Sequence, residues 1–304
     1  MKKSGILVLV GIFLSGIAVG QADYAFKVLA NKGSNQVKSG DAWQAVKTGD
    51  RLKSTDEIKV AENSYVALVH AKGKPIELKE AKTYKISDLE ARVNTTSSVV
   101  NKYTDFILSS NSAEAKKNRL SATGAVRRGG LNSADIKIFL PESQCSCEYI
   151  YNNNILVNWE PSKGTPPYIV TIRNMFEDEL MQLETPETFV QIDRSLPVLA
   201  TEDAWYVEVR SKADAKNKSD RYIVKKLSPT RQESVTKLLG EFGAEMKEET
   251  ALNKFILAGF YEENKLFIDA ISAYEEAIKL APDVPTYKEA YEEFLLRNKL
   301  KYQK

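Results

Sequence analysis

The sequence predicts a multidomain protein of the β plus α class, in which two β-sheet modules precede a helical C-terminal region. Short apolar–polar alternations, which are typical of half-buried strands, recur in residues 26–89 and again in residues 135–227. After Ser228 the apolar residues recur at helical spacing instead. The chain of 304 residues, of which 43% are hydrophobic, is long enough to bury more than one such core.

Changes in composition and periodicity divide the chain into five segments. We assign residues 1–20 to a signal peptide, 21–89 to a small β-barrel or sandwich, 90–134 to a linker with a short helix, 135–227 to a β-sandwich and 228–304 to a helical region. The expected architecture is therefore a series of small units rather than one large domain.

Residues 1–20 are typical of a secretory signal peptide. Two lysines precede an apolar run from Ile6 to Val19, and the small residues Ala18 and Gly20 precede a cleavage point at Gln21. An uncleaved anchor is the alternative, although the run is shorter than the ~20 apolar residues that span a bilayer. Later apolar runs are shorter still. We therefore expect a periplasmic or secreted bacterial protein with a Sec-type signal and without a transmembrane segment after cleavage.

Charge and cysteine content restrict the partners. The 43 basic and 41 acidic side chains nearly balance, so the composition does not favour nucleic acid as a partner. Cys145 and Cys147, the only cysteines, are separated by one residue. They form either a strained local disulfide or two free thiols. A zinc site needs about four ligands and no second Cys/His cluster exists, so we expect neither a metal nor a cofactor.

Residues 26–89 contain short alternating runs that are typical of strands: Ala42–Val46, Glu57–Val60, Tyr65–His70, Pro75–Leu78 and Thr83–Ile86. Strands so short and so closely spaced predict a compact barrel or sandwich. The turn Ala71–Lys74 joins two of them as a hairpin, in which Gly73 supplies the positive φ that the reversal needs.

This segment resembles the periplasmic FecR-type domain. The resemblance rests on the order W-x-x-V-x-x-G-D-x-L-x-x-x-D-x-I, which runs from Trp43 to Ile58, and on later residues that include Tyr65–Leu68, Gly73, Ile76 and Leu78. In transmembrane anti-sigma regulators of iron uptake, this domain senses the state of an outer-membrane receptor. The sequence contains no sigma-binding segment or mid-chain membrane helix of that kind. The resemblance therefore implies an extracytoplasmic β module for protein or envelope contact.

Trp43 and His70 are the residues of this module that invite a functional interpretation. A large aromatic side chain in a small β module mostly supplies burial, so we expect Trp43 to cover the core rather than to contact a partner. His70 is the only histidine and adjoins the hairpin turn without a neighbouring acidic or serine motif. We therefore expect a surface strand residue rather than a catalytic base.

Residues 90–134 are rich in Ser, Asn, Ala and Lys, which is typical of a linker. One apolar-periodic piece, from Val99 to Ile107, predicts a short amphipathic helix. The basic residues between Lys116 and Arg128 are not interleaved with aromatic residues that could stack on bases. We therefore expect them to belong to a solvated connector.

Residues 135–227 return to strand-like alternation in five runs: Ile136–Leu140, Ile155–Trp159, Tyr168–Ile172, Phe189–Ile192 and Trp205–Val209. About seven short strands over this length argue for a β-sandwich. The order Trp159-Glu160-Pro161, Tyr168-x-Val170-x-Ile172 and Trp205-x-Val207-x-Val209 resembles fibronectin type III and related immunoglobulin-like domains. This resemblance implies an architecture, with Trp159 in its core, and no particular function.

The helical region begins at Ser228-Pro229, which can cap a helix, and continues with helices expected at about 250–263, 267–280 and 286–299. Small and aromatic residues stand at the spacing of a helical-hairpin repeat: Leu257, Ala258, Tyr261, Ala270, Tyr274, Ala277 and Pro282. Residues 251–284 thus resemble a tetratricopeptide repeat, although Lys254 replaces the usual large aromatic residue. A single repeat cannot bury its faces, so it must pack on flanking helices, the sandwich or another chain.

The inner helix of such repeats presents one face to bound peptides. In this register Leu252, Phe255, Gly259 and Glu262 would line that face, which makes Leu252, Phe255 and Glu262 the candidate protein-binding residues. The alternative is that Leu252 and Phe255 pack on the preceding helix. We interpret the acidic residues Glu245, Glu248 and Glu249 as a solvated helix face rather than a cation site.

The sequence contains no recognisable catalytic motif. It lacks a nucleophile elbow, a zinc-protease motif, a phosphate-binding glycine loop and a dinucleotide fingerprint. Paired carboxylates leave no sequence signature, and an enzyme of that kind stays open. Our preferred hypothesis is a non-enzymatic adaptor or scaffold that binds envelope or secreted proteins. The alternative is a glycan- or peptidoglycan-binding accessory protein, which an exposed aromatic platform would favour.

Overall fold

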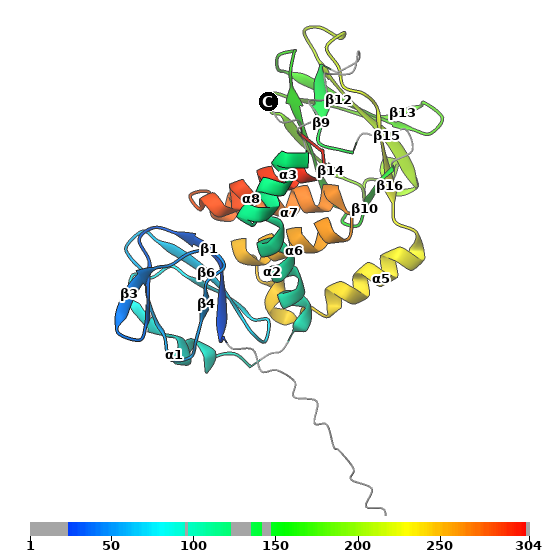
Figure 1. Cartoon of the computed structure of the whole chain (residues 1–304). Helices are drawn as coiled ribbons and strands as arrows, with labels where there is room; N and C mark the ends of the chain where they lie inside the picture. Colours follow the sequence, from blue (N-terminus) through cyan, green and yellow to red (C-terminus); the bar gives the residue numbers. More distant parts are fainter. Residues whose placement is uncertain (1–23, 95–96, 123–134, 142–146, 302–304) are drawn as a thin grey trace, which may run out of the picture.

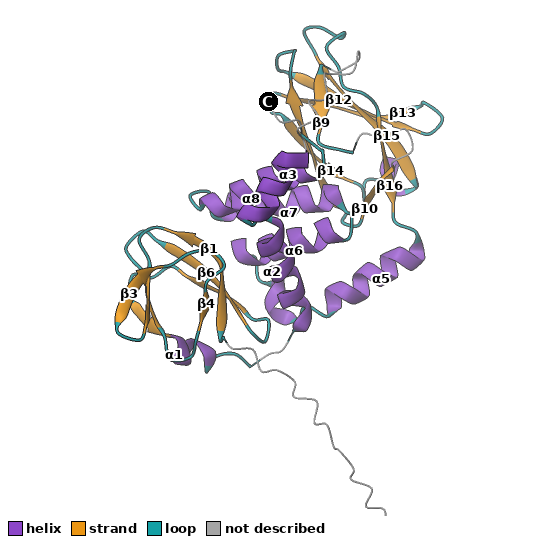
Figure 2. Ribbon diagram, in the orientation of Figure 1, coloured by secondary structure: helices purple, strands orange, loops and turns teal. Residues whose placement is uncertain are grey.

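The computed structural model describes residues 24–94, 97–122, 135–141 and 147–301. Over these ranges the protein is a mixed α/β structure with several antiparallel sheets and eight α-helices (Figures 1 and 2). None of the helices in these ranges is both long enough and apolar enough to cross a membrane. The predicted signal peptide lies outside the described residues.

The N-terminal β region contains two four-stranded sheets with the orders β4-β1-β6-β7 and β3-β2-β5-β8. The strands are β1 (Phe26–Lys32), β2 (Gln36–Ser39), β3 (Ala42–Ala45), β4 (Arg51–Leu52), β5 (Glu57–Lys59), β6 (Tyr65–His70), β7 (Pro75–Leu78) and β8 (Thr83–Lys85). Apolar side chains from both sheets share one core, for example Val28, Val37, Ile58 and Val66. The five predicted strands are present, but the sheets do not close, so the barrel alternative is wrong.

The hairpin between β6 and β7 has the predicted geometry. Gly73 has a φ of 90°, and its N–H donates to the His70 carbonyl at 2.7 Å. A Cβ atom at this position would lie 2.0 Å from the carbonyl oxygen of Ser97. Glycine is therefore required here both by its φ and by the close approach of the chain that leads into the next helix.

The segment expected to be a linker is largely helical where it is described. It contains α1 (Ile86–Glu90), α2 (Ser98–Ser110) and α3 (Ala113–Ala122). Helix α2 is the predicted amphipathic helix, and it buries Val100, Tyr103 and Ile107. Helix α3 was not predicted from the sequence. Its Arg119 side chain is 17% exposed and lies 3.1 Å from the carboxylate of Glu293, so this part is packed rather than a solvated connector.

The second β region contains a five-stranded sheet, β10-β16-β15-β12-β13, and a three-stranded sheet, β14-β11-β9. Its elements are β9 (Ile136–Ile138), β10 (Cys147–Ile150), β11 (Asn154–Pro161), β12 (Tyr168–Asn174), β13 (Glu179–Thr185), β14 (Phe189–Asp193), α4 (Pro197–Ala200), β15 (Ala204–Ser211) and β16 (Tyr222–Lys226). Trp159 and Trp205 are fully buried in a core to which both sheets contribute. Trp159 is a core residue, as predicted.

The C-terminal region contains α5 (Pro229–Gly240), α6 (Ala251–Glu263), α7 (Phe267–Leu280) and α8 (Pro285–Arg297). All four lie where the helical spacing predicts them. The side chains of Ser228 and Thr250 cap α5 and α6 by accepting backbone N–H groups of the first turn. Helices α6 and α7 pack closely on each other because Ala258, Ala270 and Ala277 are small and fully buried.

The helices lie between the two β regions (Figure 1). Their hydrophobic core includes side chains of α2 and of β6, among them Tyr103, Tyr65 and Val69. On the other side, α7 packs against β10 and β11. The single helical hairpin is thus supported from both sides by other parts of the same chain.

Candidate functional site

The three candidate protein-binding residues on α6 lie inside the molecule. Leu252 and Phe255 are each 1% exposed and Glu262 is 2% exposed. The ring of Phe255 packs edge-on against Tyr274 and Tyr287, with centroid distances of 5.9 and 4.9 Å. Leu252 lies in the first turn of α6 beside β7, where its N–H donates to the Glu77 carboxylate at 2.9 Å. None of these side chains is available to a partner in this structure.

Glu262 is the centre of a buried polar cluster. Its carboxylate accepts hydrogen bonds from Arg297 Nε at 2.8 Å and Nη2 at 2.9 Å, and from Asn298 Nδ2 at 2.8 Å. The Tyr274 hydroxyl donates to it at 3.3 Å. A buried carboxylate needs such partners, so Glu262 acts to join the last three helices.

Helix α2 covers the face of α6 on which Gly259 lies. A Cβ atom added to Gly259 would lie 2.7 Å from Cγ1 of Ile107 and 2.8 Å from its Cδ1. Tyr103 of the same helix stacks on Phe242 and meets Phe260 edge-on. An internal helix therefore occupies the face that would receive a peptide in a repeat protein.

The residues with metal-binding potential are His, Cys, Asp and Glu. The described residues contain no group of three or more His, Cys, Asp or Glu side chains that could hold a metal ion. Cys145 and the side chain of Cys147 lie outside what the structure describes, so their pairing stays a prediction. The Glu245 side chain also lies outside what the structure describes. The Glu249 carboxylate forms an ion pair with Lys254 at 2.7 Å.

His70 is buried rather than on the surface, so the expectation of a surface strand residue is wrong. It is 2% exposed, and its ring meets Phe26 edge-on at 4.8 Å. Its Nδ1 accepts the N–H of Lys72 at 2.9 Å. Strand β6 is buried along its whole length because sheets and helices cover both of its faces, which the local sequence does not reveal.

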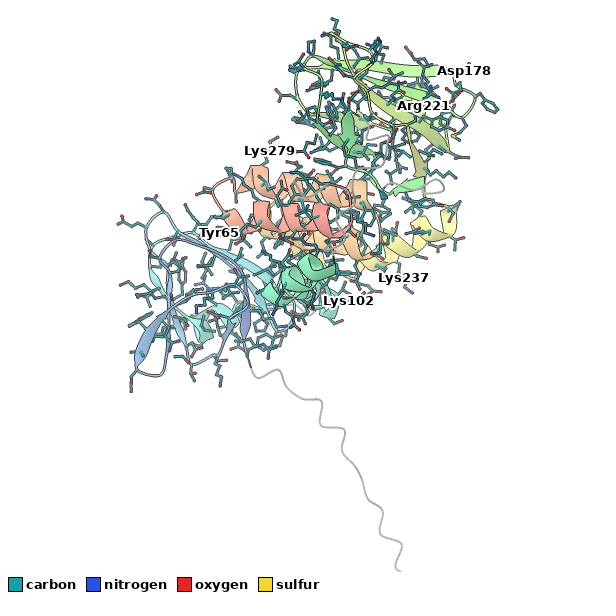
Figure 3. All side chains as sticks on the ribbon, turned by 45° about the horizontal axis from the view of Figure 1, so that its top comes forward. Tyr65, Lys102, Asp178, Arg221, Lys237 and Lys279 are labelled. Carbon is teal, nitrogen blue, oxygen red and sulfur yellow. The ribbon has the colours of Figure 1, made fainter. Side chains whose placement is uncertain are left out.

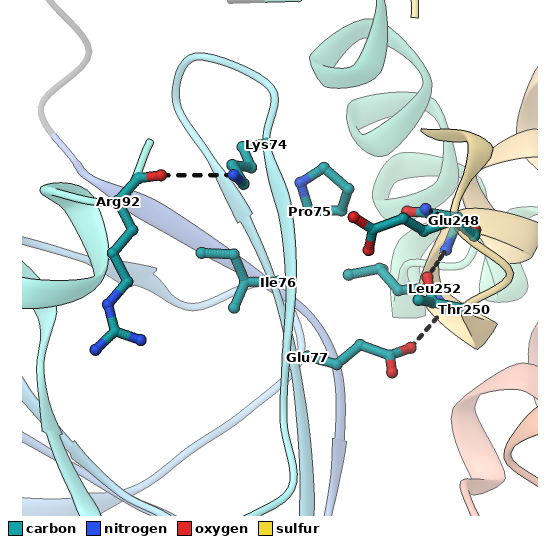
Figure 4. A pocket seen from close by; sticks show the side chains of 9 residues that line it. Lys74, Pro75, Ile76, Glu77, Arg92, Glu248, Thr250 and Leu252 are labelled. Atoms are coloured by element: carbon teal, nitrogen blue, oxygen red, sulfur yellow. Dashed lines mark hydrogen bonds between the residues drawn. The ribbon is translucent and has the colours of Figure 1, made fainter. Parts of the chain in front are cut away.

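A cavity of about 360 Å³ lies between β7 and the start of α6 (Figure 4). Its carboxylate Glu77 is already shared between the Tyr65 hydroxyl at 2.7 Å, the N–H of Leu252 and the ammonium group of Lys79 at 2.6 Å. Lys74 and Arg92 belong to the N-terminal β region and lie on the side of the cavity away from α6 (Figure 4). The polar groups at this cavity connect the N-terminal β region to α6.

A second cavity, of about 270 Å³, lies between the turn Asn152–Asn154 and helices α6 and α7. Asp269 is fully buried at its wall and accepts the N–H groups of Tyr151 and Asn152 at 2.9 and 2.8 Å. Burial raises the pKa of this carboxyl to about 6, although the hydrogen bonds from Asn152 and Tyr151 oppose the shift. The contacts of Asp269 connect the second β region to α7.

The most exposed large apolar side chain in the described residues is Phe176. It is 85% exposed, and its neighbour Met175 is 42% exposed, in the turn between β12 and β13. Leu196 and Val198, exposed by 40% and 45%, belong to the segment around α4, which packs beside β13. We call these four residues the apolar end surface.

The turn that carries Phe176 is fixed by its own hydrogen bonds. The side-chain oxygen of Asn174 accepts the N–H groups of Phe176 and Asp178, each at 2.9 Å. Glu177 has a φ of 72°, which is uncommon for a residue other than glycine. Arg221 holds the Glu177 carboxylate through two hydrogen bonds of 3.0 and 2.8 Å. The backbone is therefore ordered while the Phe176 ring stays in solvent.

Figure 3 shows Asp178 and Arg221 at the outer end of the second β region, far from the N-terminal β region. Sequence reasoning missed this surface. The signal was present, because an apolar pair stands between Asn174 and the acidic residues Glu177 and Asp178, where a hairpin turn should be polar.

Trp43 is also exposed, by 39%, so the expectation that it covers the core is wrong. It lies opposite Lys38, whereas the neighbouring residue Val37 points into the core. Because side chains alternate along a strand, Trp43 lies on the outer face of its sheet. The other two tryptophans are buried.

Comparison of the chain with protein-family models gives no match, and a search of curated proteins gives none either. The family resemblances described above therefore remain predictions.

Proposed function

We propose that the protein is a non-enzymatic, extracytoplasmic scaffold that binds envelope or secreted proteins through the apolar end surface of its second β region. The observation that carries this proposal is the 85% exposure of Phe176 on an ordered hairpin. The signal-peptide pattern of residues 1–20 supports the extracytoplasmic location.

The energetics of exposed aromatic residues favour a binding role. Burying one phenylalanine side chain in a partner is worth about 2–3 kcal/mol, and aromatic residues, phenylalanine among them, are enriched in protein interfaces. The turn is ordered by Asn174, Glu177 and Arg221 before any partner arrives. Preorganisation of this kind reduces the conformational entropy lost on binding.

We further propose the architecture that accompanies this function. The N-terminal β region would be a FecR-like sandwich and the second an immunoglobulin-like sandwich, which is supported in each case by two sheets that share one core. The pair α6–α7 would be a tetratricopeptide-like hairpin. Its role would be to join the two β regions, because Leu252, Phe255 and Glu262 are all buried.

Site-specific photo-crosslinking tests the binding role. A photoreactive phenylalanine analogue is placed at position 176 and, as a matched control, at Lys216, an exposed residue in the loop at the opposite end of the same β region. We expect a defined adduct with an envelope or secreted protein from position 176 only. Adducts of equal yield from both positions, or none from position 176, would refute the proposal.

Affinity for the captured partner then measures the contribution of the ring. We expect Phe176→Ser to weaken binding by about tenfold or more, because a truncated anchor typically costs over 1 kcal/mol. Phe189→Ser is the control, since Phe189 is 43% exposed but lies on β14 rather than in the apolar end surface.

A further inference from the structure

We propose that the free edge of β3 pairs with the same strand of a second copy of this chain, in an antiparallel, two-fold symmetric dimer. All four residues of β3, Ala42–Ala45, are exposed. Figure 1 places β3 at the outer end of the N-terminal β region, on the side away from the helices. A second molecule can therefore approach this edge without meeting other parts of the chain.

The backbone of β3 has unpaired groups along this edge. The N–H of Val46 donates to the Asn35 carbonyl at 3.0 Å, and these two residues extend the antiparallel register of β2 and β3. Backbone groups alternate in direction along a strand. Gln44 and Ala42 therefore face β2, whereas Trp43 and Ala45 direct their N–H and C=O groups away from it. No described residue hydrogen-bonds to these outward groups.

Three of the other sheet edges that are described carry features that hinder such pairing. Strand β13 has a bulge and the exposed charges Glu179 and Glu184. Strand β8 has only three residues and ends in Lys85. Strand β7 packs against α6. Strand β3 has no charge, proline or bulge, which are the usual protections of an edge strand.

The sequence of β3 and its flanks is complementary to itself in one register. The outward groups of Trp43 meet those of Ala45 from the second copy when Gln44 lies opposite Gln44. The small side chain of Ala45 then leaves room for the indole ring of Trp43. In this register Asp41 of each copy lies opposite Lys47 of the other. Both charged side chains are exposed, and neither has an ion-pair partner among the described residues.

The dimer should be weak, because four residues per strand bury much less than the roughly 800 Å² per partner of a standard interface. We expect a dissociation constant on the order of 100 µM. Sedimentation equilibrium of the chain that begins at Gln21, from about 10 µM to about 1 mM, measures it directly. A protein that stays monomeric over this range would overturn the proposal.

Charge reversal tests the register. Asp41→Lys places two lysines opposite each other at both ends of the pairing and should weaken the dimer by about tenfold. Adding Lys47→Asp to this variant restores opposite charges, so the double variant should dimerise like the original chain. A dimer that neither change affects would be formed by another surface and would contradict the proposal.

A disulfide trap gives an independent test that does not depend on affinity. Gln44→Cys, in a chain with Cys145 and Cys147 changed to serine, places two cysteines at a non-hydrogen-bonded pair, whose Cα separation of about 4.5 Å suits a disulfide. We expect rapid covalent dimers from this variant. Thr83→Cys on β8, also exposed on an edge of the same sheet, is the control. Equal yields from the two variants would exclude β3 as the interface.

Discussion

His70 combines deep burial with two nearby charges, those of Glu90 and Lys72. Its Nε2 lies 3.6 Å from the carboxylate of Glu90, which is 39% exposed. Burial lowers the pKa of His70, and the attraction of Glu90 for an imidazolium opposes this shift without cancelling it. The hydrogen bond from the Lys72 N–H to Nδ1 also requires that this nitrogen is unprotonated. The neutral ring is thus the form that the fold accommodates.

We predict that His70 titrates below its unfolded pKa of about 6.5. The unfolded chain then binds more protons between the two pKa values, so stability is complete above about pH 6.5 and is lost as the pH falls through the folded pKa. Proton NMR of the untagged protein reads this directly, because His70 is the only histidine. In His70→Gln this acid-dependent loss should be absent. A titration at or above pH 6.5 would contradict the prediction.

At the scale of elements, the contact between α2 and α6 depends on Gly259. Alanine in a helix is normally more stable than glycine by about 0.5–1 kcal/mol. At position 259, however, a Cβ atom would come within 2.8 Å of the Ile107 side chain. Overpacking of this kind costs about 1–3 kcal/mol, so the steric term should exceed the gain in helix propensity.

We predict that Gly259→Ala lowers the free energy of unfolding by about 1–2 kcal/mol, measured by urea denaturation. Gly240→Ala on α5 is the matched control, because nothing lies within 4 Å of a Cβ there, and it should be neutral or stabilising. Adding Ile107→Ala should relieve the clash of the Gly259 variant, at the cost of the Ile107 contacts. Equal stability of the two alanine variants would mean that α2 does not pack tightly on α6.

The elements differ in how far the sequence predicts them. Apolar spacing predicts α2 and α5–α8 because helical periodicity is a local property of the chain. Strand β13 escapes notice because its glutamates and glutamine interrupt the apolar pattern, as expected for an edge strand. Leu252 and Phe255 have the spacing of a helix face, but their covering comes from residues tens to hundreds of positions away. Periodicity identifies a face to be buried and does not identify its partner.

The same distinction explains the outcome for single residues. Trp43 lies on the outer face of its sheet, one residue away from a position on the core face. Alternation predicts that a strand has two faces, but it does not say which face is buried. The apolar pair that contains Phe176 stands out in a polar turn, but the exposure of its ring follows from the turn formed by Asn174 and Glu177. His70 adjoins a polar turn in the sequence, yet the sheet that contains it is covered by the helices.

At the scale of the whole molecule, the helical region is the joint between the two β regions. The Tyr65 and Tyr287 hydroxyls lie 2.7 Å apart at one contact. At the other contact Asp269 of α7 accepts two backbone N–H groups from Tyr151 and Asn152.

With a folded pKa of about 6, above the usual value of 3.8, the Asp269 carboxyl contributes most to stability below about pH 4 and least above pH 6. Measurements at pH 7.5 therefore concern the charged form.

We predict that Asp269→Ala at pH 7.5 destabilises this joint by about 2–4 kcal/mol, because two buried N–H groups lose their acceptor. Urea denaturation should then resolve separate transitions of the second β region and the rest of the chain, and small-angle X-ray scattering should give a larger radius of gyration.

Asp283→Ala is the matched control. It removes another carboxylate that joins the helical region to a β region, but its pair with Lys32 is 66% exposed on the aspartate side, and exposed pairs contribute little to stability. If both variants unfold like the original chain, Asp269 does not hold the β region to α7.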